Sequence, residues 1–212
     1  NGLENKSTFN NNAGEIKIDR STQVGLSNKF NFTNAAKITI GATASVGDRG
    51  LENEVGTFNN TTGGDITING AIDRGLFNTF GGTFTNVAKI SVNGASYGIT
   101  NYNSSFQNNT NGEIKVDNSL RMGVLNEQGT FTNLAKISIN VLDNSTDGLV
   151  NRDVFNNSAA GVLEIDGASG TYLVNQRGTF TNAAKIKLGG LSATEAINGI
   201  RNEDLFNNNL GG

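Results

Sequence analysis

One short sequence pattern occurs nine times along the 212 residues of the chain. Aligned on a phenylalanine, each copy has Asn two positions after the Phe, a second Asn four to six positions before it, and an aliphatic residue two positions before that second Asn. Eight copies continue into two aliphatic residues in an "IxI" arrangement. A unit of 22–27 residues cannot cover its own apolar face, so it has to stack on its neighbours.

When the nine copies are aligned, the residues at one place of the pattern form a column, and two of these columns consist of asparagine. The Phe column is Phe9, Phe32, Phe58, Phe84, Phe106, Phe131, Phe155, Phe180 and Phe206. The Asn column that follows it is Asn11, Asn34, Asn60, Asn86, Asn108, Asn133, Asn157, Asn182 and Asn208. The Asn column that precedes it is Asn5, Asn28, Asn53, Asn78, Asn101, Asn126, Asn151, Asn175 and Asn202. In stacked identical turns, Asn amides hydrogen-bond to the same amide one coil away, and Asn also tolerates the left-handed backbone of a sharp corner. We therefore expect both Asn columns to be internal structural ladders beside the Phe column.

Each unit contains three short segments of period-2 alternation separated by Gly- and Asn-rich turns, which indicates three strands per coil. Left-handed hexapeptide coils need a steady 18-residue turn, and the spacing in this chain is longer and more variable. We therefore predict an all-β fold, a right-handed three-sided parallel β-helix of about 8.5 coils, with residues 1–212 as a single β-solenoid domain. At ~4.8 Å per coil its length would be roughly 40 Å.

The copies alternate between two kinds. The gap from the Phe to the first aliphatic residue of "IxI" is six in even copies and seven or eight in odd copies. The residue before that aliphatic alternates in charge, in a charge column made of Glu15, Lys37, Asp65, Lys89, Glu113, Lys136, Val162 and Lys185. Exposed ion pairs contribute only ~0.2–1 kcal/mol each, but a slip by one coil would set like charges side by side. The true repeat is therefore two coils, and we expect Glu164 to compensate for Val162.

The composition excludes several classes of function. Lys and Arg number 16 and Asp and Glu 19, for a net charge of −3 without a basic stripe, so we expect no nucleic-acid partner. No window approaches the ~18 consecutive apolar residues of a membrane-spanning helix, so we expect no membrane insertion. The chain contains no Cys, which removes disulfides and thiolate metal sites together.

The sequence offers little support for a catalytic or metal site. The chain has no His, and its acids lie mostly in the charge column or in expected turns with a glycine at the corner, over residues 47–50 and 72–75. Asp143, Asn144 and Asp147 could gather oxygen atoms in one loop, but the nonapeptide of calcium-binding solenoids is missing. We therefore predict no enzyme activity, no cofactor and no metal site.

One expected strand face carries no charge. The residues on either side of each Phe would point outward, and the candidates for a recognition face are Thr57, Asn59, Thr83, Thr85, Thr130, Thr132, Thr179 and Thr181. Such rows follow from the preference of Thr for strands combined with duplication of the repeat. They also resemble the ice-binding faces of solenoid antifreeze proteins, and a glycan on a cell surface is a third interpretation. Phe77 and Tyr102 are the aromatic residues expected to point outward nearby.

The repeat "GLxN…GTFTNxAKIxI" resembles the repeats of large bacterial surface proteins over the whole chain. The most similar in style are filamentous-haemagglutinin-like exoproteins and autotransporter passenger domains. The resemblance implies secretion, a right-handed β-helix, and a role in attachment or in building an extracellular fibre.

The expected function is therefore that of a non-enzymatic structural or adhesive rod, extracellular and on a bacterial cell surface. The chain starts at a coil boundary, "NGLEN", and stops within a coil, "FNNNLGG". We expect it to be either a segment of a longer solenoid or a fibre subunit that stacks end to end with copies of itself. The alternative is a binding module that uses the Thr/Asn face for a glycan or ice.

Overall fold

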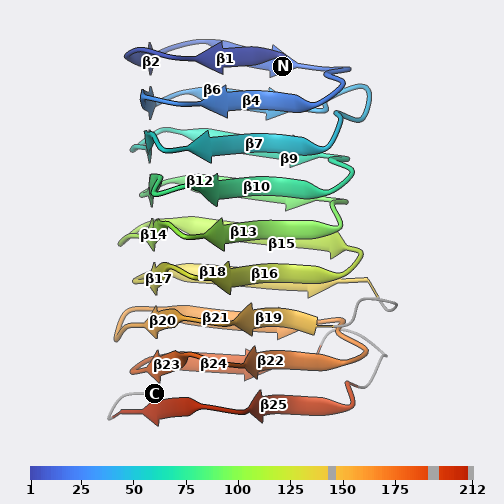
Figure 1. Cartoon of the computed structure of the whole chain (residues 1–212), viewed down its shortest axis with the longest axis vertical. Coiled ribbons are helices and arrows are strands. Elements are labelled where there is room, and N and C mark those ends of the chain that lie inside the picture. The colour runs from blue at the N-terminus through green and yellow to red at the C-terminus, as the bar shows by residue number, and fades with distance from the viewer. Residues whose placement is uncertain (143–146, 191–195, 210–212) are drawn as a thin grey trace.

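The computed structural model describes residues 1–142, 147–190 and 196–209, and these residues form strands and no helix. The strands make three parallel sheets, two of nine strands and one of eight, and every third strand enters the same sheet. We call them sheets A, B and C, and we number the coils by the strand that each contributes to sheet A (Figure 1). The fold is the three-sided parallel β-solenoid that the repeat predicts.

The strand bounds follow the repeat closely. Sheet A consists of β1 (Leu3–Asn5), β4 (Val24–Asn28), β7 (Arg49–Glu54), β10 (Arg74–Thr79), β13 (Tyr97–Tyr102), β16 (Met122–Glu127), β19 (Asp147–Asn151), β22 (Thr171–Asn175) and β25 (Asn198–Asn202). Sheet B consists of β2 (Phe9–Asn11), β5 (Asn31–Asn34), β8 (Thr57–Asn60), β11 (Thr83–Asn86), β14 (Ser105–Asn108), β17 (Thr130–Asn133), β20 (Val154–Asn157), β23 (Thr179–Asn182) and β26 (Leu205–Asn208). Sheet C consists of β3 (Glu15–Ile18), β6 (Lys37–Ile40), β9 (Asp65–Asn69), β12 (Lys89–Asn93), β15 (Glu113–Ser119), β18 (Lys136–Val141), β21 (Val162–Asp166) and β24 (Lys185–Leu188).

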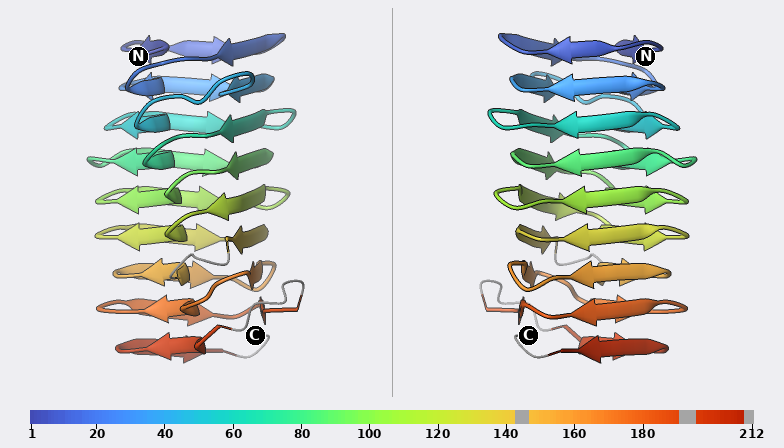
Figure 2. Two further views of the ribbon diagram at one scale, coloured as in Figure 1. Left: turned by 90° about the vertical axis from the view of Figure 1, so that its right-hand side faces the viewer. Right: turned by 90° about the vertical axis from the view of Figure 1, so that its left-hand side faces the viewer.

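The path of the chain makes the coil right-handed. In Figure 1 the strands of sheet A run from right to left in front, the strands of sheet C run from left to right behind them, and the chain descends from coil to coil. Figure 2 shows the same stacking from two other sides. The predicted hand is therefore correct.

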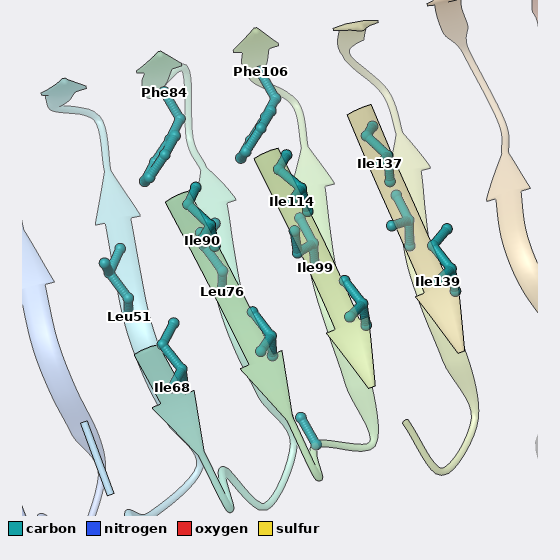
Figure 3. Packing of buried hydrophobic residues seen from close by; sticks show 14 of the residues in the cluster. Leu51, Ile68, Leu76, Phe84, Ile90, Ile99, Phe106, Ile114, Ile137 and Ile139 are labelled. Atoms are coloured by element: carbon teal, nitrogen blue, oxygen red, sulfur yellow. The ribbon is translucent and has the colours of Figure 1, made fainter. Parts of the chain in front are cut away.

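The repeated apolar residues fill the space between the three sheets. The rings of the Phe column stack along the axis, with centroids of neighbouring rings between 4.5 and 5.0 Å apart. Aliphatic residues of sheets A and C, such as Leu76, Ile90 and Ile114, line the same core (Figure 3). Each stacked aromatic pair contributes roughly 0.5–1.5 kcal/mol beyond the area it buries. The core is therefore one continuous column rather than a set of separate clusters.

Both Asn columns form hydrogen-bonded ladders on the inner side of the strands. In sheet A, Asn53 Nδ2 donates to Asn78 Oδ1 at 2.8 Å, and Asn78 Nδ2 donates to Asn101 Oδ1 at 2.9 Å. In sheet B, Asn60 Nδ2 donates to Asn86 Oδ1 at 2.8 Å. Every one of these ladder bonds that the structure describes runs in the same direction, from the amide nitrogen of one coil to the amide oxygen of the next. Both ladders therefore have a direction, with hydrogen-bond donors pointing towards one end of the rod and acceptors towards the other.

The ladder amides also satisfy backbone carbonyls at the corners between sheets. Asn53 Nδ2 donates to the carbonyl of Gly56 at 2.9 Å, and Asn86 Nδ2 donates to the carbonyl of Ala88 at 2.9 Å. The left-handed backbone belongs to other residues, since the second residue after the sheet A Asn has positive φ at Val55, Phe80, Asn103, Gln128 and Arg177. The expectation that ladder Asn residues adopt the left-handed corner conformation is therefore wrong. Their role at the corner is to pair buried carbonyls that would otherwise lack a partner.

The glycine of the "GLxN" pattern lies inside a strand rather than at the corner of a turn, contrary to expectation. Gly50 and Gly75 are the second residues of β7 and β10. A Cβ atom on Gly75 would lie 2.1 Å from Val92 Cγ1 in the core and 2.7 Å from the carbonyl oxygen of Gly98 on the next coil. Close packing of coil on coil, and not turn geometry, is the reason for glycine at this place.

The two-coil alternation is present in the structure. In the charge column, Lys37 lies opposite Glu15 and Asp65, and its Nζ is 3.1 Å from a Glu15 oxygen. At the interruption by Val162, Lys136 Nζ instead lies 3.3 Å from a Glu164 oxygen, so the predicted compensation is confirmed. The longer turns of the odd coils project at one edge of the rod (Figure 2).

Replacement of Asn133 by Ala should destabilise the protein by roughly 2–4 kcal/mol, because it removes partners from buried amides on both neighbouring coils. Asn108 Nδ2 donates to Asn133 at 2.9 Å, and Asn133 donates to Asn157 at 2.8 Å. Thr132→Ala, one residue away on the outer face, should cost less than about 1 kcal/mol. Urea unfolding of the two variants measures the difference, and equal losses would contradict the internal ladder.

Candidate functional site

The outer face of sheet B holds all eight residues predicted as a recognition face. Thr57 lies opposite Thr83, and Asn59 lies opposite Thr85. Strand β14 lies between β11 and β17 and has Ser and Gln in the two outward columns. Strand β20 lies between β17 and β23 and has Val and Asn there. The candidates therefore share two columns on one face, but their Thr rows are interrupted.

The accessibility of this face is moderate. Thr83 and Thr130 are exposed, and the other six candidates are half-buried. Tyr102 is half-buried, whereas only 7 % of Phe77 is exposed. Both aromatic residues belong to the neighbouring sheet A. Phe77 lies in an outward column of sheet A, as expected, but two arginines cover its ring.

A row of Arg side chains over aromatic rings lies on the outer face of sheet A. The guanidinium carbons of Arg49 and Arg74 are 5.1 and 4.6 Å from the centre of the Phe77 ring. Those of Arg74 and Arg121 are both 5.6 Å from the centre of the Tyr97 ring. Each such contact is worth about 0.5–1 kcal/mol at an exposed site. These Arg–aromatic contacts run from coil 3 to coil 6 along the outer face of sheet A.

A small apolar cluster continues this row. Leu125, Val150 and Val174 follow Phe77 in the same outward column, and their exposed fractions are 6, 1 and 0 %. Tyr97 and Met122 are packed against them. Strand alternation predicts outward side chains here but not their burial. The apolar residues at the third position of "GLxN" were the signal in the sequence that could have revealed this cluster.

Glu52 is a buried carboxyl group on the same outer face. It is 5 % exposed, and Arg49 Nη1 donates a hydrogen bond of 2.6 Å to its Oε1. Burial raises the pKa of Glu52, and the positive charge of Arg49 offsets only part of this effect. The buried carboxyl group is thus paired with Arg49, which fits a structural role.

The outer face of sheet C contains a polar hollow of about 450 Å³. Lys136 and Lys187 place their ammonium groups 3.3 and 3.6 Å from the carboxylate of Glu164. Burial opposes ionisation of Glu164, but these two lysines together lower its pKa. Lys115 is paired in the same way with Asp117 at 2.6 Å. The charges of the hollow are therefore compensated within the chain.

The residues of the chain that the structure describes contain no group of three or more His, Cys, Asp or Glu side chains that could hold a metal ion. Asp143 and Asn144 lie outside the described residues, and Asp147 accepts a 3.0 Å hydrogen bond from the Thr171 backbone N–H. Among the described segments there is also no helix with the length and apolar character needed to cross a bilayer.

Comparison of the sequence with protein-family models, with curated proteins and with solved structures gives no match in any of the three cases. The surfaces described above are therefore the basis for any functional proposal.

Replacement of Glu52 by Gln should change how stability depends on pH. Because the pKa of Glu52 in the folded chain is raised above 4.5, the folded protein holds this proton more tightly than the unfolded chain and loses stability as the pH rises through that window. The Gln side chain does not ionise. The stability of Glu52→Gln relative to the unmodified protein should therefore increase with pH from about 4 and then level off.

Urea unfolding over a pH series measures this difference, and Glu4→Gln is the control. A hydrogen bond from Lys6 lowers the pKa of Glu4, so its contribution is present above the ordinary pKa and is lost as the pH falls. The relative stability of Glu4→Gln should therefore decrease with rising pH. A slope of the same sign for both variants would contradict the burial of Glu52.

Proposed function

We propose that the protein is a non-enzymatic structural or adhesive rod of a bacterial cell surface, where it forms or belongs to an extracellular fibre. The observation that carries the proposal is the continuity of the Phe stack and the two Asn ladders from coil 1 to coil 9. Each added coil repeats the same axial contacts, so length can grow without any change in cross-section. Such a fold suits a molecule whose task is to span a distance.

The extracellular location rests on the resemblance of the "GLxN…GTFTNxAKIxI" repeat to bacterial exoproteins and autotransporter passenger domains. Rods of this kind carry many unrelated duties, so the fold alone does not choose between attachment and scaffolding. Antibody labelling of intact and permeabilised cells that make the protein tests the location. Labelling only after permeabilisation would contradict it.

The ladder hydrogen bonds all point in the same direction along the axis, which supports head-to-tail extension of the rod. Asn202 and Asn208, in the last described coil, accept hydrogen bonds from the coil before them, whereas Asn5 and Asn11 donate to the coil after them. A further coil, from the same chain or from a second copy, would therefore meet ladder donors at one end and ladder acceptors at the other. Stacking of copies would be head to tail, a heterologous contact that builds filaments.

Electron microscopy of the purified chain at high concentration tests this stacking. Filaments with a subunit spacing of roughly 40 Å would support a fibre subunit. Separate short rods at every concentration would contradict end-to-end stacking of copies.

A binding module is the second candidate, because sheet B presents an uncharged face with side chains in register from coil to coil. A glycan or ice would be the ligand of this face. The two candidates differ in what they require of the outward Thr residues.

The double replacement Thr85→Lys and Thr132→Lys distinguishes the candidates. Both side chains are half-buried on the outer face, and a Lys there can extend its ammonium group into water. We expect folding and assembly to be unchanged, with a loss of stability below about 1 kcal/mol. Urea unfolding, microscopy, and retention on insoluble neutral polysaccharides and on ice are the measurements.

Thr67→Lys with Ser91→Lys, at half-buried outward places on sheet C, is the matched control. Retention of the unmodified protein on one of these surfaces, lost only in the sheet B variant, would overturn the structural proposal in favour of a binding module.

A further inference from the structure

The turns between sheets B and C give one edge of the rod a toothed outline. In odd coils 3, 5 and 7, a backbone hydrogen bond of 2.6–2.8 Å across four residues closes the turn. The two central residues of each such turn are exposed, and we call them teeth: Thr62–Gly63, Thr110–Asn111 and Ala159–Ala160. Coil 1 has a shorter tooth at Ala13–Gly14. The even coils make the same corner with a shorter turn and without a projection.

Coils 2, 4 and 6 each form the floor of a notch between two teeth, and among the described residues the notch of coil 8 is bordered by the tooth of coil 7 alone. At coil 4 the notch has a volume of about 370 Å³, with Val87 and Ala88 as its floor, Gly63 and Asn111 in its two walls, and Lys89 beside it. Pairs at the same corner of the other even coils are Ala35–Ala36, Leu134–Ala135 and Ala183–Ala184. The notches therefore have small apolar floors and a Lys at one side.

The spacing of the teeth restricts what can fill several notches together. Phe rings of neighbouring coils are 4.8 Å apart, so teeth on every second coil recur at about 10 Å. An extended peptide repeats its side chains every ~7 Å and does not match this period. The toothed edge of a second copy matches it at every step.

We propose that two copies of this chain pair side by side through their toothed edges, in antiparallel orientation. With the twofold axis between coils 4 and 5, the teeth of coils 1, 3, 5 and 7 face the notches of coils 8, 6, 4 and 2 of the other copy. A parallel twofold pair would set tooth against tooth. The antiparallel pair is isologous and therefore closed.

The charges beside the teeth and notches agree with this pairing. An acid follows the tooth in coils 1, 3 and 5, and a Lys follows the floor of each notch. The pairing brings Glu113 of one copy to Lys89 of the other, and Asp65 of one copy to Lys136 of the other. Among the residues that the structure describes, Lys89 and Glu113 form no ion pair within their own chain. Lys89 and Glu113 are therefore free to pair across the interface, whereas Lys136 already pairs with Glu164 of its own chain.

The pairing uses the side of the rod, whereas filament extension uses its ends, so either can fail without the other. The contact would be confined to one edge of the rod, so we expect it to bury less than the ~800 Å² per partner of a standard interface. We therefore expect dimers only at high protein concentration, unless longer rods multiply the contacts.

Disulfide cross-linking tests the pairing, since the chain contains no Cys of its own. In the double variant Thr62→Cys and Leu134→Cys, the tooth of coil 3 should meet the notch of coil 6 in the other copy. Within one chain these positions lie three coils apart, roughly 15 Å, and a disulfide needs Cα atoms within about 7 Å. Mild oxidation should therefore give a covalent dimer that disappears on reduction.

Thr67→Cys with Ser138→Cys is the matched control, because these residues come from the same two coils on the open face of sheet C. We expect the control to stay monomeric on the same non-reducing gel. Cross-linking of both variants to the same extent, or of neither, would overturn the proposal.

Sedimentation of the chain without cysteines provides an independent measurement. Val87→Arg fills the notch of coil 4, whereas Ser91→Arg places the same side chain on the open face of sheet C. The first change should abolish dimers at concentrations where the unmodified chain and the second variant form them. If the chain stays monomeric and Val87→Arg instead abolishes retention on a linear polysaccharide, the notches serve a glycan and the pairing is wrong.

Discussion

The Asn side-chain amides of the two inner columns set the condition that the rest of the structure has to meet. A buried amide without a partner costs about 1–3 kcal/mol, and each of these amides finds its partner in the same residue of the next coil. This condition requires coils of equal cross-section at a spacing near 4.8 Å. It also keeps the Phe rings in stacking distance, because each ring lies two residues before a ladder Asn.

The same condition explains where the chain tolerates variation. Coil length varies because the turns between strands differ, while the strands stay in register apart from one shift between Asp117 and Ser119, where β15 pairs with β18. Differences between coils therefore lie mostly at the surface, and Tyr172, in the place of a glycine, is an exception in the core. Sheet A carries Arg, aromatic and apolar side chains, sheet B is neutral, and sheet C carries charges of both signs. Function has to be sought on these faces and edges, since the interior is nearly the same in every coil.

The candidate sites could be predicted less well than the fold. The pairing of Lys136 with Glu164 could be predicted from the charge column, because strands in register place outward residues of neighbouring coils side by side. The burial of Phe77 did not follow, because it depends on Arg49 and Arg74, whose side chains reach the ring from a different column of the same strands. The residue with the left-handed backbone was also predicted wrongly. Periodicity locates the corner to within a few residues, whereas the local turn decides that Val55 or Phe80, and not the ladder Asn, has positive φ.

The sequence by itself determined the three-strand coil, the stacking of nine copies, the two Asn ladders and the two-coil alternation. These features depend on residues that recur at a constant spacing, and repetition alone reveals them. Only the tertiary structure decided that the ladders point one way along the axis, that Gly75 is needed for contact with the next coil, and that longer odd turns leave notches between them. Each of these depends on how two neighbouring coils fit against each other in space, and a linear pattern does not contain that fit.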